Sequence, residues 1–123
     1  MKRALNKIGC ILTLITMMIT LPVASLGGAT GGPKEGNIRL DANTYTKINV
    51  SFNARELAFI GLKGNGNTDL DIYVLDQNNK LIISDTDNSD TCLVEWVPAL
   101  TETFTIYVVN RGNIHNDFYI MTN

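Results

Sequence analysis

Beyond residue 44 the chain alternates repeatedly between apolar and polar side chains, in short stretches separated by residues that favour turns. In residues 45–52, for example, Ile48, Val50 and Phe52 share one parity, and polar residues occupy most of the other. A period of two is typical of a β-strand that buries one face. No stretch after the first 25 residues keeps a helical period for three turns. The chain is therefore predicted to be all-β.

Seven stretches of this kind follow one another along the sequence. The predicted strands cover residues 45–52, 57–62, 69–74, 80–84, 92–97, 104–109 and 118–121. Between them lie short segments rich in Gly, Asn, Asp and Ser, such as 64–67 and 87–89, and these residue types accept turn geometry. Seven or eight short strands separated by such turns are typical of an antiparallel β-sandwich or barrel.

The first 25 residues have the composition of a secretory signal peptide. Lys2, Arg3 and Lys7 form a basic start, residues 8–21 are almost entirely apolar, and small residues follow. This order of zones is typical of an export signal. The apolar run of about 14 residues is shorter than the roughly 20 that cross a bilayer as a helix. We therefore expect a secreted or periplasmic protein, with an uncleaved N-terminal anchor as the alternative.

The end of the signal is open to two interpretations, because cleavage after Ser25 and cleavage after Ala29 both leave small residues at the required positions. Cys10 lies inside the apolar run with a lysine three residues before it, where a lipidation site requires an apolar residue, so a lipid anchor is rejected. Residues 26–36 are rich in glycine and are predicted to form a flexible leader. The remaining residues, 37–123, suffice for one small β-sandwich domain.

The exported part of the chain is acidic. The whole chain has ten Lys and Arg and twelve Asp and Glu, and three of the cations lie in the predicted signal. Seven cations against twelve anions give the exported part a net charge of −5. Nucleic acid binds basic surfaces, so it is not an expected partner. No stable membrane span is expected once the signal is removed.

Most of the negative charge lies between residues 69 and 102, where eight carboxylates accompany one cation, Lys80. Carboxylates this dense repel one another unless water or a cation separates them. Calcium prefers oxygen ligands from loops and strand ends, so a calcium cofactor is one interpretation of this cluster. The other is a solvated acidic edge that discourages pairing between sheets, and it is the favoured one because carboxylates are common in turns. The candidate calcium ligands are Asp69, Asp71, Asp85, Asp87 and Asp90.

Cys92 is the only cysteine of the exported part, so no disulfide within the domain is expected. It alternates with Val94 and Trp96, which places all three on one face of a predicted strand. We expect a buried thiol that behaves as a small apolar side chain. An intermolecular disulfide is the alternative.

The sequence offers little for catalysis. Its single histidine, His115, lies between two predicted strands, and no serine-hydrolase or zinc-protease motif is present. A glycosidase needs only two carboxylates at a fixed separation, for which Asp71 and Glu95 are one pair among many. We therefore expect a protein that is not an enzyme, with a small glycan-active enzyme as the weaker alternative.

Two tyrosines are candidates for binding a ligand. Tyr73 and Tyr107 have the opposite parity to Ile72 and Ile106, so their rings are expected on the face that does not enter the core. An outward aromatic ring can stack on a sugar or on a peptide. Trp96 shares the parity of the apolar residues on its own strand and is expected in the core.

Residues 67–76, Asn-Thr-Asp-Leu-Asp-Ile-Tyr-Val-Leu-Asp, resemble the Asp-Leu-Asp-Leu-Tyr-Val signature of the bacterial pre-peptidase C-terminal domain. Further segments are similar to the later strands of that family and occur in the same order, at 80–85, 95–98, 104–110 and 117–121. The resemblance covers residues 44–122, nearly all of the exported part.

The resemblance implies a β-sandwich of jelly-roll type. Domains of this family are usually appended to secreted proteases and other exported enzymes, where they aid secretion or bind a polymer substrate. Collagenase relatives bind collagen and calcium, and the match places Asp69 and Asp71 on the acidic strand of the family. The collagenase type also draws calcium ligands from an acidic segment before its first strand, and here the corresponding segment, residues 31–36, has Glu35 as its only acidic residue. We expect a free-standing secreted module that binds a protein or polysaccharide, with a structural or assembly protein of the cell envelope as the alternative.

Overall fold

The structure is a computed structural model that describes residues 28–123. The predicted signal peptide, including Cys10 and the cleavage point after Ser25, lies outside these residues. The described part contains no helix, and hence none that could cross a membrane. It contains eight strands: β1 (Glu35–Leu40), β2 (Tyr45–Phe52), β3 (Ala58–Lys63), β4 (Leu70–Leu75), β5 (Leu81–Asp85), β6 (Thr91–Trp96), β7 (Glu102–Asn110) and β8 (Asn116–Thr122).

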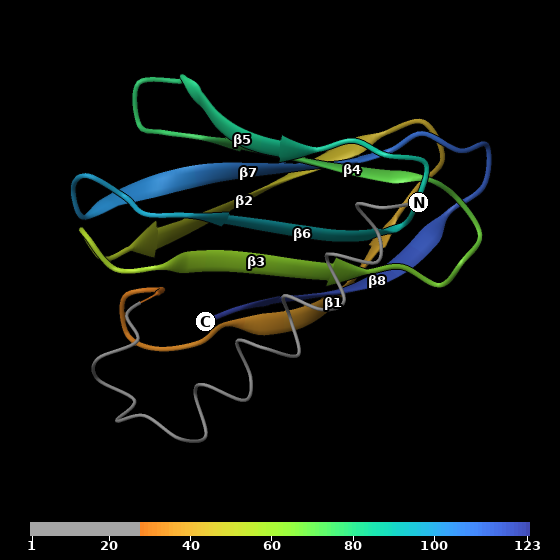
Figure 1. The fold of residues 1–123 in the computed structure, drawn as a ribbon. Helices are drawn as coiled ribbons and strands as arrows, with labels where there is room; N and C mark the ends of the chain where they lie inside the picture. Colours follow the sequence, from red (N-terminus) through yellow and green to blue (C-terminus); the bar gives the residue numbers. More distant parts are fainter. Residues whose placement is uncertain (1–27) are drawn as a thin grey trace.

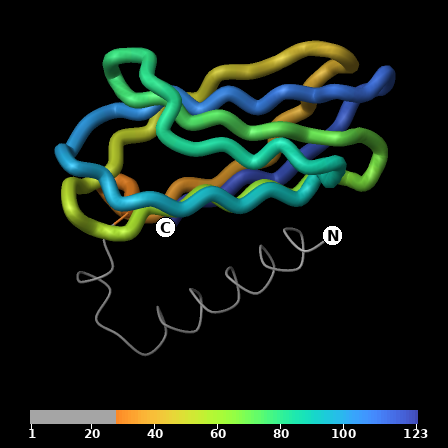
Figure 2. Tube along the Cα trace, turned by 45° about the horizontal axis from the view of Figure 1, so that its top comes forward, coloured from red at the N-terminus to blue at the C-terminus, as the bar shows by residue number. Residues whose placement is uncertain are grey.

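The strands form two four-stranded sheets that lie face to face (Figure 1). One sheet has the order β1-β8-β3-β6 and the other β2-β7-β4-β5, and every pairing is antiparallel. Neighbouring strands are mostly distant in sequence, so the chain crosses repeatedly from one sheet to the other (Figure 2). This arrangement confirms the predicted antiparallel β-sandwich of jelly-roll type.

The core lies between the sheets and is built by the apolar parity of each strand. The side chains of Ile72, Ile106 and Val108 are fully buried there, as the alternation predicts. Trp96 packs against the same core, where its ring meets Phe52 and Phe104 edge-on at centroid distances of 5.0 and 5.2 Å. Such perpendicular contacts between aromatic rings are favourable. The core position expected for Trp96 is therefore confirmed.

Cys92 is fully buried in this core and forms no disulfide within residues 28–123. Its Sγ donates a hydrogen bond to the carbonyl of Leu70 at 3.2 Å. The prediction of a buried thiol is confirmed.

The sandwich includes residues that lie before the predicted start of the domain at residue 37. Ala29, within the segment expected to be a flexible leader, forms an antiparallel bridge with Phe52 and is buried. The backbone N–H of Ala29 also donates to the carbonyl of Asn123 at 3.0 Å. Strand β1 then begins at Glu35, before the predicted domain start at residue 37. The alternation of β1 is weak in the sequence, because Ile38 and Leu40 are the only apolar side chains on its inward face and the third inward residue is a glycine.

Candidate ligand-binding face

The two predicted binding tyrosines meet on the outer face of the β2-β7-β4-β5 sheet. Tyr73 on β4 lies directly opposite Tyr107 on β7, and Tyr107 lies opposite Lys47 on β2. Directly opposite residues of antiparallel strands point to the same face, with Cβ atoms about 5 Å apart. The neighbouring residues Ile72 and Ile106 are fully buried, so this face is the one directed away from the core.

A third tyrosine extends the row. The ring of Tyr45 lies 5.6 Å from that of Tyr107, at an interplanar angle of 45°, and 61% of Tyr45 is exposed. The Nζ atom of Lys47 lies 5.9 Å from the centroid of the Tyr107 ring, within the range of a cation–π contact. We call Tyr45, Tyr73 and Tyr107 together the tyrosine face.

One end of the tyrosine face is held by an ion pair. The Nε atom of Arg111 donates to Asp71 Oδ2 at 2.8 Å, and its Nη2 atom donates to the Tyr73 hydroxyl at 3.0 Å. The hydrogen bond to Asp71 and then that to Tyr73 raise the pKa of Arg111 above its ordinary value. The guanidinium therefore stays charged beside the Tyr73 ring, and the two bonds fix the position of the Tyr73 hydroxyl.

The tyrosine face combines apolar rings with hydrogen-bonding groups and cations. A tyrosine presents an apolar ring surface and a polar tip, which suits a ligand with the same mixture of surfaces. The three rings cross adjacent strands β2, β7 and β4 in a row, which suits an extended ligand. Two cations, Lys47 beside the Tyr107 ring and Arg111 beside Tyr73, add donors for hydroxyl or carboxylate oxygens.

The predicted calcium ligand Asp85 is the last residue of β5, and Asp87 and Asp90 lie in the connection from β5 to β6. All three carboxylates accept hydrogen bonds from the backbone. The N–H of Leu93 donates to Asp85 Oδ2 at 3.1 Å. The N–H of Ser89 donates to Asp87 Oδ1 at 3.1 Å. Asp90 Oδ2 accepts the N–H of Gly66 at 2.6 Å and the side-chain amide of Asn116 at 3.3 Å. These carboxylates stabilise turns and a strand edge.

The other two predicted ligands lie apart from that connection. Asp71 points to the outer face with the tyrosines, whereas Asp85 lies opposite the inward Ile72, so one sheet separates their side chains. Asp69 precedes β4, and its carbonyl accepts the N–H of Arg111 at 2.9 Å. Residues 28–123 contain no group of three His, Cys, Asp or Glu side chains that could hold a metal ion. Calcium stays a prediction from the sequence.

The acidic edge is also less solvated than predicted. Asp71, Asp85 and Asp87 are 4%, 2% and 8% exposed, so a wholly solvated edge is wrong for these three. A buried carboxylate needs hydrogen-bond donors, and each of the three has at least one.

The carboxylate pair considered for a glycosidase is not a pair in space. Asp71 points outward from the β2-β7-β4-β5 sheet, and Glu95 has the outward parity of β6 in the opposite sheet. The sandwich therefore lies between them, and they cannot flank one glycosidic bond. His115 lies in the β7–β8 loop, with Nε2 3.9 Å from Asp117 Oδ2.

The fold is similar to that of solved bacterial proteins. The pre-peptidase C-terminal domain of collagenase from Bacillus anthracis matches with a TM-score of 0.61 and 8% identity, over 78% of this chain and 90% of that one. The mitogen of Yersinia pseudotuberculosis matches with a TM-score of 0.59 and 8% identity, over 75% and 85%. The periplasmic inhibitor of g-type lysozyme from Aeromonas hydrophila matches with a TM-score of 0.56 and 8% identity, over 74% and 84%.

These likenesses concern the fold. No protein-family model matches the chain, and no curated protein matches it in sequence. The fold of the collagenase domain is the one that the residue pattern around 67–76 indicates, so the resemblance is supported as far as a pre-peptidase C-terminal-like fold.

Sequence reasoning found Tyr73 and Tyr107 but missed three members of the site. Tyr45 and Lys47 have the parity opposite to Ile48 and could have been assigned to the outer face by the same argument. Arg111 lies in a loop, and its contact with Asp71 depends on the pairing of β4 with β7, which no local pattern reveals.

Proposed function

We propose that this protein is an exported, non-catalytic β-sandwich module that binds a polysaccharide chain on its tyrosine face. The observation that carries the proposal is the row of three tyrosine rings on adjacent strands of one outward face, with Lys47 beside Tyr107 and Arg111 beside Tyr73. Sugar rings have apolar faces that stack on aromatic rings and hydroxyl groups that bond to charged side chains.

Several observations support binding over catalysis. The pair Asp71 and Glu95 is divided by the sandwich, and Asp71 is already bonded to Arg111. The tyrosine face lies on regular strands, whose register fixes the spacing of the rings. Rigid rings in a fixed row favour retention of a ligand, and no described group beside them has the setting of an activated nucleophile.

Export is supported by the basic, apolar and small-residue zones at the N-terminus. The Aeromonas protein of similar fold is a periplasmic inhibitor, and the collagenase domain is part of a protease. The same sandwich thus occurs in proteins that contact other macromolecules. We place this protein outside the cytoplasm, with an extracellular or envelope polysaccharide as its partner.

Retention on insoluble polysaccharides tests the proposal. The purified protein is mixed with cellulose, chitin, xylan and peptidoglycan, and the bound fraction is measured over a range of protein concentrations. We expect saturable binding to at least one polymer, and Tyr107→Ala to weaken it about tenfold, which corresponds to 1.4 kcal/mol. Tyr107 is the central ring, so its loss interrupts contact with both neighbours.

Tyr119→Ala is the matched control. Tyr119 lies on β8 in the opposite sheet, opposite Asn37 of β1, so its removal alters the same residue type on the other face. The control should bind as the wild type does, with thermal melts showing that both variants are folded. Equal loss in both variants, or no retention on any polymer, would count against the proposal.

A further inference from the structure

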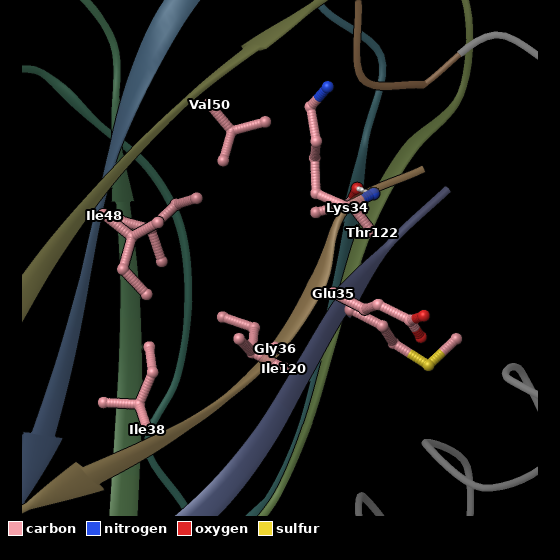
Figure 3. A pocket seen from close by; sticks show the side chains of 10 residues that line it. Lys34, Glu35, Gly36, Ile38, Ile48, Val50, Ile120 and Thr122 are labelled. Carbon is pink, nitrogen blue, oxygen red and sulfur yellow. Dashed lines mark hydrogen bonds between the residues drawn. The ribbon is translucent and has the colours of Figure 1, made fainter. Parts of the chain in front are cut away.

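The sandwich has an opening between two of its edge strands. β1 is an edge strand of one sheet, and β2 is an edge strand of the other. At the opposite edges of the two sheets, β5 and β6 contact each other. A groove of about 170 Å³ lies on the β1–β2 side (Figure 3). Its walls come from β1, β2, β7, β8 and the residue before β1. Its lining includes Lys34, Gly36, Ile38, Ile48, Val50 and Ile120.

Gly36 leaves the groove open. It lies within β1 with the inward parity of Ile38 and Leu40, opposite Ile120 on β8. A Cβ atom added to Gly36 would meet no atom within 4 Å, and the φ angle of Gly36 is not positive. The β1–β8 register is regular, so the glycine serves neither a bulge nor a turn. A glycine inside a strand then commonly marks the close approach of a ligand or another chain.

The size and lining of the groove define what it can hold. A closed apolar cavity of about 150 Å³ accepts a molecule of benzene's size. The groove is similar in volume, is open to solvent, and is walled mainly by branched aliphatic side chains such as those of Ile38, Ile48 and Val50. An alkyl segment of about six carbons would fill it and remove these side chains from water.

The charged residues at the groove favour an anionic head group. Lys34 is the one cation among the lining residues, and its backbone is held in place by two hydrogen bonds with Thr122, at 3.0 and 2.8 Å. Glu35 is the one lining carboxylate, and it accepts a hydrogen bond from the hydroxyl of Tyr119. Figure 3 shows the Glu35 side chain turned away from Ile48 and Val50. An acid bound in the groove would therefore meet an ammonium group.

We propose that the β1–β2 groove binds a medium-chain aliphatic carboxylate, with its alkyl chain beside Gly36 and its carboxylate near Lys34. This site is separate from the tyrosine face, because Ile48 and Val50 point inward from the strand whose outward residues are Tyr45 and Lys47. The two activities can therefore be lost independently.

Titration with octanoate, at concentrations below its micellar range, tests the proposal. Chemical shifts of the isoleucine methyl groups are followed by NMR in the purified protein. We expect saturable shifts at Ile38 and Ile48, and about tenfold weaker binding of butyrate, which buries fewer methylene groups. Absence of saturable shifts with octanoate would overturn the proposal, as would binding only to phospholipid vesicles.

Three variants sharpen the test. Gly36→Leu places a side chain in the groove and should abolish octanoate binding, while Asn37→Leu adds the same side chain on the outer face of β1 and should leave binding unchanged. Lys34→Gln should weaken octanoate binding about fivefold, as for loss of an exposed ion pair, and leave binding of octan-1-ol unaltered. Unchanged binding in a folded Gly36→Leu protein, or in Lys34→Gln, would contradict the assignment.

Discussion

The two sides of the sandwich, where β5 meets β6 and where β1 meets β2, differ in how the edge strands of the two sheets are joined. At the β5–β6 side the chain passes directly from one sheet to the other, and the inward carboxylate of Asp85 accepts the N–H of Leu93 on β6. At the β1–β2 side the chain also passes from one sheet to the other, through residues 41–44, but Gly36 leaves space between the two edge strands at the level of the groove. One edge is closed by a buried polar contact, and the other is left open.

The difference shows how a small domain can combine stability with a place for a ligand. An inward charge beside a strand edge prevents further pairing, but it must keep its hydrogen-bond donor to be tolerated. An open apolar groove forgoes burial that the domain could have used, because a larger side chain than glycine would fit. The contacts at the closed side therefore raise the free energy of unfolding, whereas the unfilled groove at the open side lowers it.

The largest effect should come from breaking the closed side. Asp85→Ala removes the acceptor for Leu93 N–H and leaves a buried donor unpaired, which costs about 2 kcal/mol of unfolding free energy. Asp85 is 2% exposed, so water does not readily replace the carboxylate. Chemical denaturation measures the loss.

Asp85→Asn is the control, since its amide keeps an oxygen that can accept the same bond. It should lose less than half as much as the alanine variant. Equal losses would show that the negative charge, and not the hydrogen bond to Leu93, stabilises this edge. A loss below about 0.5 kcal/mol for Asp85→Ala would show that the edge is closed by other contacts.

One strand of the closed side was predictable from the sequence, whereas the contact between Asp85 and Leu93 and the open side were not. Alternation in 92–97 predicts β6 and the buried position of Cys92, because each inward residue there is apolar. In β1 the inward positions are Gly36, Ile38 and Leu40, and the first of these carries no apolar signal. The first two residues of β1 therefore fell in the predicted leader, and residues 37–40 fell before the first predicted strand, so this wall of the groove was not predicted.

The candidate sites divide in the same way. The outward positions of Tyr73 and Tyr107 follow from parity, which is a local property of each strand. Their position opposite each other depends on the pairing of β4 with β7, which are separated by two other strands in the chain. The separation of Asp71 from Asp85 likewise depends on which face each side chain takes, and the density of acidic residues in the sequence does not encode that.

Filling the groove at the open side with a larger side chain should raise the free energy of unfolding, by less than Asp85→Ala lowers it. Gly36→Leu removes the entropic cost of a strand glycine and buries part of an apolar side chain, which should add about 1 kcal/mol to the unfolding free energy. Asn37→Leu, on the outer face of the same strand, should add less because its side chain stays in water. Destabilisation by Gly36→Leu in chemical denaturation would show that the groove is too narrow for the added atoms.

Calcium should have the smallest effect, because four of the five carboxylates that would bind it already accept hydrogen bonds within the domain. Asp85, Asp87 and Asp90 accept backbone N–H groups, and Asp71 holds Arg111 on the opposite face of the sheet. We expect millimolar calcium to change the melting temperature by less than about 1 °C, with magnesium as the control cation. Occupancy of a site at a hundredfold its Kd would instead add about 2.7 kcal/mol and raise the temperature by many degrees. A rise of that size, abolished in the double variant Asp69→Ala and Asp71→Ala, would restore the calcium site that the sequence predicts and give the closed side a second means of stabilisation.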